Sequence, residues 1–331
     1  MAKMNTVRFH EHGPPEVLRY EQVERPVPGP GEALVRISTI GVNYGDVMRR
    51  QAPDLYPMPS PLPWTCGGEA VGTVVEVGEG ISPTILGQRS VVFPGKGCYS
   101  DYTVVPINRV YGISSELSDA QAIALFVQGL TAAFILRHSA RLAPGEAVLV
   151  QGAAGGVGSL AVQLAKIQGA GLVIGCAGSA EKCRLVESLG ADLAVNYTDP
   201  DWAEQVRAFT GGAGVDVVLE MTGGKVAEDS LGLLRMFGRS VVFGHTSGGA
   251  LAIDMGMLPQ RNLSVIGFYM RPYLDIGTLV ADTLAEFADH VASGRLQVQL
   301  GGSFPLSRAA DAHRQLESRS TTGKLVLIPD A

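Results

Sequence analysis

One glycine-rich segment has residue types and spacing that can bind a phosphate. Residues 149–158 read Leu-Val-Gln-Gly-Ala-Ala-Gly-Gly-Val-Gly, where an apolar strand is predicted to end and a helix to begin. Backbone N–H groups at a helix N-terminus, together with the helix dipole, bind anions. Small residues let a pyrophosphate approach the backbone. The candidate binding residues are therefore Ala153, Ala154, Gly155, Gly156, Val157 and Gly158.

The match to the dinucleotide-binding pattern is incomplete. Ala153 stands at the first of the three glycine positions, ahead of Gly155 and Gly158. For the segment alone, the alternative is a glycine-rich turn that binds no ligand. The strands and helices that alternate on both sides of it favour a dinucleotide site.

The residues after the next predicted strand favour NADPH over NADH. NAD sites usually carry Asp or Glu about 20 residues beyond the loop, where it binds the ribose 2′-hydroxyl. Here the strand tip has Ala177 and Gly178 with no acid, Ser179 and Lys182 follow, and Tyr197 ends another strand. A hydroxyl and an ammonium group hold a 2′-phosphate that a carboxylate would repel. The alternative for Lys182 is a solvated helix residue.

Apolar strands alternate with helices through the middle of the chain. This pattern is typical of a parallel sheet covered on both faces, and six strands match the doubly wound dinucleotide-binding sheet. The fold class is therefore α/β. The predicted strands are 147–150, 172–176, 194–197, 215–220, 240–243 and 263–266, and the predicted helices are 157–168, 180–189, 202–209 and 225–234.

The remaining parts of the chain predict a second domain. The first third is rich in β-strand patterns and in proline loops, one of them over residues 53–63, and a helix is predicted at 119–140. Near the end, helices at 279–293 and 307–317 precede a strand at 324–328, which we expect to return to the first domain. The predicted domains are residues 1–124 with 267–331, and residues 125–266.

Composition excludes several classes of protein. The chain has 331 residues with a net charge of −6, which argues against a nucleic-acid-binding protein. Hydrophobic residues make up 46%, enough for a sizeable core. The four cysteines form no C-x-x-C pair and follow no apolar signal core, so we expect a reduced, cytoplasmic protein. No stretch reads as a membrane span.

Several segments carry a resemblance to a known family. They are Gly41-Val42-Asn43-Tyr44-Gly45-Asp46, Gly129-Leu130-Thr131-Ala132-Ala133, residues 153–158, Gly190-Ala191-Asp192 with Asn196-Tyr197, and Glu317-Ser318-Arg319 near residues 323–327. Together they resemble the medium-chain dehydrogenase/reductase superfamily, in its zinc-free quinone oxidoreductase branch, which includes zeta-crystallin. The resemblance covers nearly the whole chain.

The resemblance implies a fold, a cofactor and a reaction. The fold is a GroES-like β-barrel domain with a Rossmann doubly wound parallel-sheet domain. The cofactor is NADPH, the small-molecule substrates are quinones or α,β-unsaturated carbonyls, and the chain forms a homodimer. Zinc-dependent relatives place a Cys ligand where this chain has Asn43 and a His ligand at Gly68, and they carry a four-cysteine lobe that is absent here. We therefore expect no metal.

Hydride reduction without metal needs little help from the protein, but hydrogen-bond donors can stabilise the anion that develops on the acceptor oxygen. By resemblance, Asn43, Tyr56 and Thr131 line the nicotinamide site. The alternatives are a turn residue for Asn43 and an ordinary loop aromatic for Tyr56. Asp46 either orients this site or caps a helix.

Further residues are candidates for cofactor contact. His245 invites a proton-donor interpretation, although we prefer a backbone contact there. Arg319 and Lys324 are candidates for the cofactor phosphates, with ordinary surface residues as the alternative. The other candidates at predicted strand ends are Thr222, Phe243, Gly244 and Thr246.

Two other functions compete with NADPH-dependent quinone or enone reduction. A 2-enoyl-thioester reductase would use the same hydride delivery and would need a proton donor, for which Tyr56 is the candidate. A non-catalytic nucleotide-binding structural protein is the third hypothesis.

Overall fold

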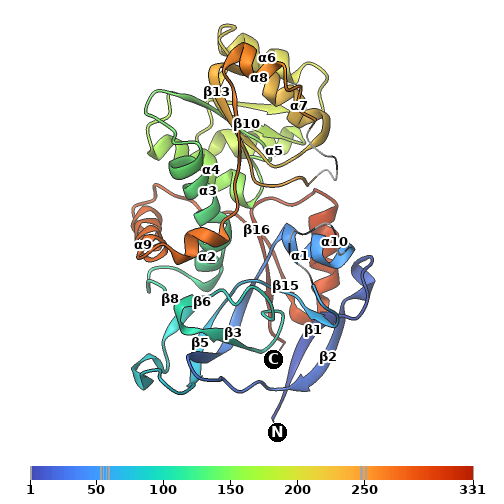
Figure 1. Cartoon of the computed structure of the whole chain (residues 1–331), viewed down its shortest axis with the longest axis vertical. Coiled ribbons are helices and arrows are strands. Elements are labelled where there is room, and N and C mark those ends of the chain that lie inside the picture. The colour runs from blue at the N-terminus through green and yellow to red at the C-terminus, as the bar shows by residue number, and fades with distance from the viewer. Residues whose placement is uncertain are drawn as a thin grey trace. The chain divides into compact units, whose positions relative to one another are not determined.

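The computed structural model describes residues 2–330 except 53, 55, 57, 59, 247, 248, 250 and 251 (Figure 1). The chain forms two compact units. Unit 1 comprises Met1–Val127 and Leu300–Ala331, and unit 2 comprises Gln128–Gln299.

Residues 267–299 lie in unit 2, whereas the sequence analysis assigns them to the other domain. Two contacts explain this placement. The ring of Tyr273 stacks on Phe134 with 5.2 Å between ring centroids. Arg137 forms two hydrogen bonds, of 2.7 and 2.5 Å, with the carboxylate of Glu286. Side-chain packing, which the strand and helix pattern does not report, therefore sets this boundary.

Unit 1 is built from β-sheets. A seven-stranded sheet has the order β15-β16-β3-β5-β6-β8, with β7 paired to β3, and a three-stranded sheet has the order β2-β1-β4. The strands are β1 (Lys3–Phe9), β2 (Arg19–Glu24), β3 (Glu32–Val42), β4 (Trp64–Thr65), β5 (Ala70–Val77), β6 (Arg89–Val92), β7 (Tyr102–Pro106), β8 (Val110–Gly112), β15 (Leu300–Pro305) and β16 (Lys324–Ile328). Its helices are α1 (Tyr44–Gln51), α2 (Asp119–Ala124) and α10 (Ala309–Glu317).

The terminal strand β16 pairs with β3, as predicted. The pairing is antiparallel, with Leu325 opposite Val42 and Val326 opposite Gly41. Phe9, Ile40 and Leu327, each fully buried, belong to the core beneath these strands. This register brings the first residue of β16 beside the residues that follow β3.

Unit 2 contains a six-stranded parallel sheet of order β11-β10-β9-β12-β13-β14. Numbered from β9, this is the 3-2-1-4-5-6 order of the doubly wound dinucleotide-binding fold. The strands are β9 (Ala147–Val150), β10 (Leu172–Ala177), β11 (Leu193–Asn196), β12 (Val215–Glu220), β13 (Leu234–Val242) and β14 (Ser264–Gly267). The helices are α3 (Leu130–Phe134), α4 (Gly156–Ile167), α5 (Ala180–Ser188), α6 (Trp202–Phe209), α7 (Gly224–Gly232), α8 (Met257–Arg261) and α9 (Leu279–Ala292).

The helix predicted at 119–140 is present but irregular. Two π-helical turns, Leu125–Gly129 and Ile135–Ser139, interrupt its α-helical segments. Among the described residues, Asp119–Ser139 is long and apolar enough to cross a membrane. Its most apolar window is 72% buried inside the protein, which is the behaviour of a core helix.

Candidate active site

The glycine-rich loop joins β9 to α4 in the predicted manner. Gly155 is the N-cap residue of α4, and the loop backbone closes through a 2.8 Å hydrogen bond from Gly155 N–H to the Gly152 carbonyl. A Cβ atom on Gly158 would lie 2.3 Å from that carbonyl oxygen and 2.7 Å from Ala153 Cα. Only glycine therefore permits this approach of helix to strand.

Gln128 is a neighbour of the loop that the sequence analysis misses. A Cβ atom on Gly156 would lie 2.1–2.2 Å from the carboxamide of Gln128, so the amide covers the first residue of α4. The Gln128 Oε1 atom is buried and accepts no hydrogen bond within the described part of the chain.

The four residues predicted to select NADPH come together at the ends of β10 and β11. Ser179 is the N-cap of α5, where its hydroxyl accepts a 3.3 Å hydrogen bond from Lys182 N–H. A Cβ atom on Gly178 would lie 2.7 Å from the Tyr197 hydroxyl. Partial burial lowers the pKa of the Lys182 ammonium. A hydroxyl, a phenol and an amine thus surround a strand tip that carries no carboxylate.

A buried carboxylate organises the ends of β12 and β13. Glu220 is 1% exposed, and its Oε1 accepts hydrogen bonds from Thr222 N–H at 2.5 Å, the Thr222 hydroxyl at 2.7 Å and Gly223 N–H at 2.8 Å. Phe243 N–H donates to the Glu220 carbonyl at 3.0 Å, and Thr246 N–H donates to the Met221 carbonyl at 2.9 Å. The predicted residues of these two turns are therefore neighbours.

Gly244 packs against the first of these turns. A Cβ atom on Gly244 would lie 3.5 Å from the Cβ atom of Met221. The side chain of His245 is exposed. Glu220 escapes the sequence analysis because an acid at the end of an apolar strand reads as a surface residue.

In unit 1, a polar cluster forms around Asn43, at the N-cap of α1. Asn43 Nδ2 donates to Glu69 Oε1 at 2.7 Å. Lys324 Nζ donates to Asn43 Oδ1 at 2.8 Å and to Glu69 Oε1 at 2.5 Å. The side chains of Glu69 and Lys324 are both 0% exposed. A Cβ atom on Gly41 would lie 2.4 Å from Glu69 Oε1, so glycine at 41 makes room for the carboxylate.

These contacts correct the expectation for Lys324. Its ammonium is fully buried and bound to Glu69 and Asn43, so we no longer count it among the phosphate ligands. Nor is it the surface residue of the alternative interpretation. A buried cation needs a paired anion, and Glu69 supplies it.

Asp46 caps α1 and binds two backbone N–H groups. Its Oδ2 accepts from Asn43 N–H at 3.1 Å, and its Oδ1 accepts from Gly67 N–H at 3.1 Å. Burial raises the pKa of the Asp46 carboxyl to about 6, against the lowering effect of these two hydrogen bonds and of Lys324.

We expect the Asp46 carboxyl to titrate near pH 6 in the folded protein, above the ordinary value of 3.8. The folded protein then holds this proton more tightly than the unfolded chain does. The contribution of Asp46 to the free energy of unfolding is consequently greatest below about pH 4 and declines as the pH rises to 6. Carboxyl ¹³C NMR, assigned with Asp46→Asn, checks this, and a midpoint below pH 4.5 would contradict it.

Tyr56 packs on α1. A Cβ atom on Gly45 would lie 3.0 Å from its ring, and the Arg49 guanidinium lies 3.7 Å from the ring centroid. Arg49 also lies 4.8 Å from the centroid of Trp64 and donates to the Ser60 hydroxyl at 2.9 Å. This buried cation was not predicted, and it attaches the proline-rich loop to α1. Four residues of that loop lie outside the described residues.

Thr131 and Arg319 complete the predicted set. Thr131 lies in α3 and is 7% exposed. Arg319 is exposed in the turn between α10 and β16, with a φ of +56°. Burial raises the pKa of the nearby Tyr44 phenol, against the lowering effect of the Arg319 charge.

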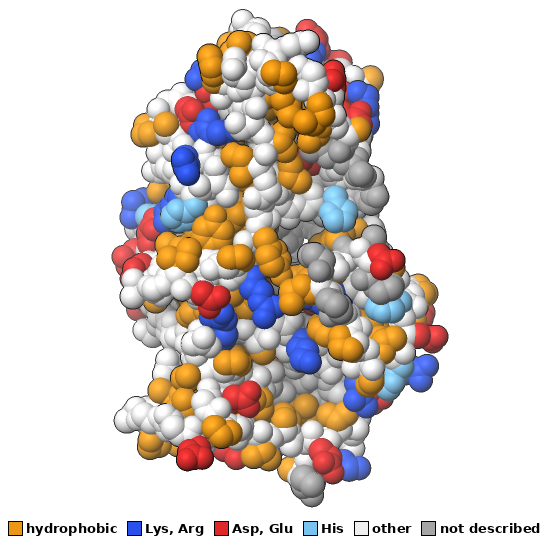
Figure 2. All heavy atoms as spheres, viewed as in Figure 1, with side chains coloured by type: hydrophobic (Ala, Val, Ile, Leu, Met, Phe, Trp, Pro, Cys, Tyr) orange, Lys and Arg blue, Asp and Glu red, His pale blue; other side chains and the backbone are white. Residues whose placement is uncertain are grey.

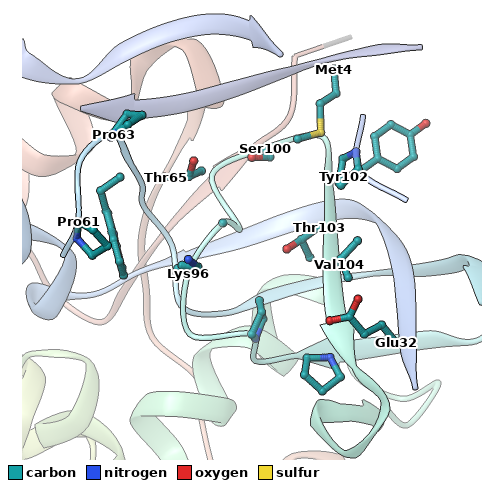
Figure 3. A pocket seen from close by; sticks show the side chains of 15 residues that line it. Met4, Glu32, Pro61, Pro63, Thr65, Lys96, Ser100, Tyr102, Thr103 and Val104 are labelled. Atoms are coloured by element: carbon teal, nitrogen blue, oxygen red, sulfur yellow. The ribbon is translucent and has the colours of Figure 1, made fainter. Parts of the chain in front are cut away.

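A pocket of about 400 Å³ opens in unit 1, lined by residues that include Met4, Trp64, Lys96 and Tyr102 (Figure 3). None of the predicted site residues lines it.

Two family models match the chain. The model described as "Alcohol dehydrogenase GroES-like domain" matches residues 29–115, and the one described as "Zinc-binding dehydrogenase" matches residues 156–286. The first match lies in unit 1 and the second in unit 2.

Relatives and a solved structure agree with these matches. The chain is 36% identical to quinone oxidoreductase 1 of Escherichia coli over 98% of this chain and 99% of that one. It is 34% identical to a 2-haloacrylate reductase of Burkholderia, over 98% of both chains. The crystal structure of E. coli quinone oxidoreductase complexed with NADPH superimposes with a TM-score of 0.92 at 35% identity, covering 99% of this chain and 100% of that one. With its two matched domains and these relatives, the chain belongs to the quinone oxidoreductase branch of the medium-chain dehydrogenase/reductase superfamily.

Proposed function

We propose that this protein is an NADPH-dependent oxidoreductase that reduces quinones or α,β-unsaturated carbonyl compounds without a metal ion. The observation that carries the proposal is the loop at residues 152–158, where Gly158 leaves no space for a side chain and the first turn of α4 presents its N–H groups. The E. coli relative whose structure holds NADPH supports the choice of cofactor.

The residues present fit NADPH. The loop at 153–158 would hold the pyrophosphate, and Ser179, Lys182 and Tyr197 would hold the 2′-phosphate. The turns at Thr222 and at residues 243–246 would contact the nicotinamide half through their backbone. NADPH, once bound, supplies a hydride.

We expect Ser179→Asp to reduce the preference for NADPH over NADH. Aspartate keeps the N-cap of α5 but places a negative charge where the 2′-phosphate would bind. The loss of one charge-assisted hydrogen bond costs about 1.5–3 kcal/mol, so the KM for NADPH should rise roughly 10- to 100-fold. The KM for NADH should stay unchanged. Steady-state kinetics with both cofactors checks this, and the uncharged cap Ser179→Asn should keep the preference for NADPH.

The chain's own chemistry at the acceptor is hydrogen bonding. Asn43 offers an N–H, and a donor of this kind stabilises the negative charge that develops on an acceptor oxygen. Glu69 and Lys324 keep the amide in place. No side chain has to change its charge for a quinone to be reduced, because the hydroquinone oxygens take protons from water.

The donor set around Asn43 does not fit zinc. Burial raises the pKa of the Cys66 and Cys98 thiols well above the ordinary range, so neither is a thiolate at neutral pH. The Lys324 ammonium already neutralises Glu69 and would repel a divalent cation. Within the described residues, no three His, Cys, Asp or Glu side chains converge as a metal site.

A second candidate reaction is the reduction of a carbon–carbon double bond conjugated to a carboxylate or thioester. The 2-haloacrylate reductase of Burkholderia favours it. Such a reaction leaves a carbanion that must take a proton at carbon, and Tyr56 is the candidate donor.

We expect Tyr56→Phe to lower kcat for 2-chloroacrylate or an enoyl thioester by about 10²–10⁴-fold. The kcat for 1,4-benzoquinone should stay within about threefold of the wild-type value, because a quinone needs no protonation at carbon. Kinetics on one preparation with both acceptors checks this. Equal losses for both acceptors would contradict a proton-donor role for Tyr56.

The central experiment is turnover. Purified protein should oxidise NADPH in the presence of 1,4-benzoquinone, before and after dialysis against a chelator. Tight NADPH binding without turnover of any acceptor would favour the non-catalytic alternative, and an activity that requires added zinc would contradict the metal-free proposal.

We also propose that the protein is a cytoplasmic homodimer. The strand β14 ends the parallel sheet of unit 2, and its outer edge offers backbone groups for pairing. Figure 2 shows hydrophobic side chains gathered over the region of α7 and α8. Among exposed residues of unit 2, Phe237 is 72% exposed and Met255 70%. Light scattering after size exclusion tests this assignment.

A further inference from the structure

We infer that Glu69 and Lys324 are positioning residues that lock the side-chain amide of Asn43 in one of its two orientations, with the N–H group presented as the donor. The inference rests on the proposed function and assigns two buried residues to it.

The lock follows from the chemistry of the two partners. A carboxylate has acceptors and no donor, and an ammonium group has donors and no acceptor. Glu69 therefore requires Nδ2 of Asn43 on its side, at 2.7 Å, and Lys324 requires Oδ1 on the other, at 2.8 Å. A flipped amide would set a carbonyl oxygen against the carboxylate and an N–H against the ammonium, so both contacts would become repulsive.

Burial strengthens the preference for the observed orientation of the Asn43 amide over the flipped one. Glu69 and Lys324 are 0% exposed, so no bulk water screens either contact or replaces a lost partner. The carboxylate itself is fixed from its other side, because Glu69 Oε2 accepts from Val127 N–H at 3.0 Å. Gly41 leaves the space that this placement needs.

One hydrogen of the locked amide is left for a ligand. Nδ2 carries two hydrogens, and Glu69 accepts one of them. Among the described residues, no other group accepts from Nδ2, and the Asn43 side chain is half-buried. The Oδ1 atom is occupied by Lys324. The geometry therefore makes Asn43 a donor, directed at a negatively charged or carbonyl oxygen, and not an acceptor.

A double-mutant cycle tests whether Lys324 acts through Asn43. We expect Lys324→Met to lower kcat/KM for 1,4-benzoquinone roughly 10- to 100-fold in the wild-type background, as misplacement of a positioned group does. In the Asn43→Ala background, the same substitution should change kcat/KM less than about twofold. The dissociation constant of NADPH, measured by fluorescence, should stay the same in all four proteins.

Two results would overturn the inference. One is that Lys324→Met lowers kcat/KM by the same factor in the Asn43→Ala background as in the wild type. The other is that Lys324→Met weakens NADPH binding by as much as it lowers kcat/KM, which would make Lys324 a cofactor ligand. If Lys324→Met does not fold, the neutral pair Glu69→Gln with Lys324→Met replaces it in the cycle, since it leaves no unpaired buried charge.

A spectroscopic measurement separates this inference from the proposed function. The side-chain ¹⁵N resonance of Asn43, assigned by its loss in Asn43→Ala, is recorded with no cofactor or acceptor present. We expect a shift characteristic of a carboxylate-bound amide, and a move toward the free-amide position in the Glu69→Gln, Lys324→Met pair. If the wild-type protein turns over no acceptor, the proposed function fails. This resonance still shows whether Glu69 and Lys324 fix the orientation of the Asn43 amide. An unchanged resonance would overturn the inference.

Discussion

Asn43→Ala should lower kcat for 1,4-benzoquinone by about 10²–10³-fold, the usual cost of removing one donor to a developing oxyanion. The NADPH dissociation constant should change less than twofold, because we propose other residues as the ligands of the cofactor and Asn43 as the donor to the acceptor. Stopped-flow measurement of NADPH oxidation together with a fluorescence titration checks both values.

The control for this substitution is Asn108→Ala, which removes an exposed amide in unit 1 and should leave both quantities unchanged. A loss of NADPH affinity that matches the loss of kcat would contradict the role given to Asn43. A wild-type rate in Asn43→Ala would assign the hydrogen bond to another donor.

Lys324→Met should lower the free energy of unfolding by about 3–5 kcal/mol, because it leaves Glu69 buried and charged without its partner. The combined change Glu69→Gln with Lys324→Met should recover at least half of this loss, since it removes both charges. Urea denaturation followed by circular dichroism gives the three values.

An exposed ion pair provides the comparison. Lys166 contacts Asp192 at 2.7 Å, with side chains 35% and 29% exposed. Lys166→Met should cost no more than about 1 kcal/mol, as surface pairs do. If the two lysine substitutions cost the same, burial does not set the strength of the Lys324 contact.

The sequence predicts the parallel sheet of unit 2 well, because the signals for its strands are local. Apolar runs and the intervening helix patterns locate each parallel strand, and the predicted helix at 202–209 coincides with α6. The backbone of the glycine-rich loop and the N-cap at Ser179 were also predictable, since they depend on small residues and caps at fixed spacing. The length of β13 was not, because Arg235, Gly238 and Arg239 interrupt the apolar pattern that marks the other strands.

The partners of Asn43 could not be predicted, because they come from distant parts of the chain. Glu69 and Lys324 are 255 positions apart, and the pairing of β3 with both β16 and β5 brings them together. A lysine before an apolar strand reads as a surface residue by composition. Lys324 can be buried because the carboxylate of Glu69 lies beside it. The spacing of apolar residues in the sequence gives no sign of such a pair.

The pairing of β3 with β16 also has a kinetic consequence. Asn43 and Lys324 are 281 positions apart, and all of unit 2 lies between them in the sequence. Closing so long a loop is entropically costly, and non-local strand pairing is slow. We therefore expect unit 2 to reach its native structure while unit 1 still lacks a strand, so that the ammonium that holds Asn43 arrives among the last contacts as the chain folds.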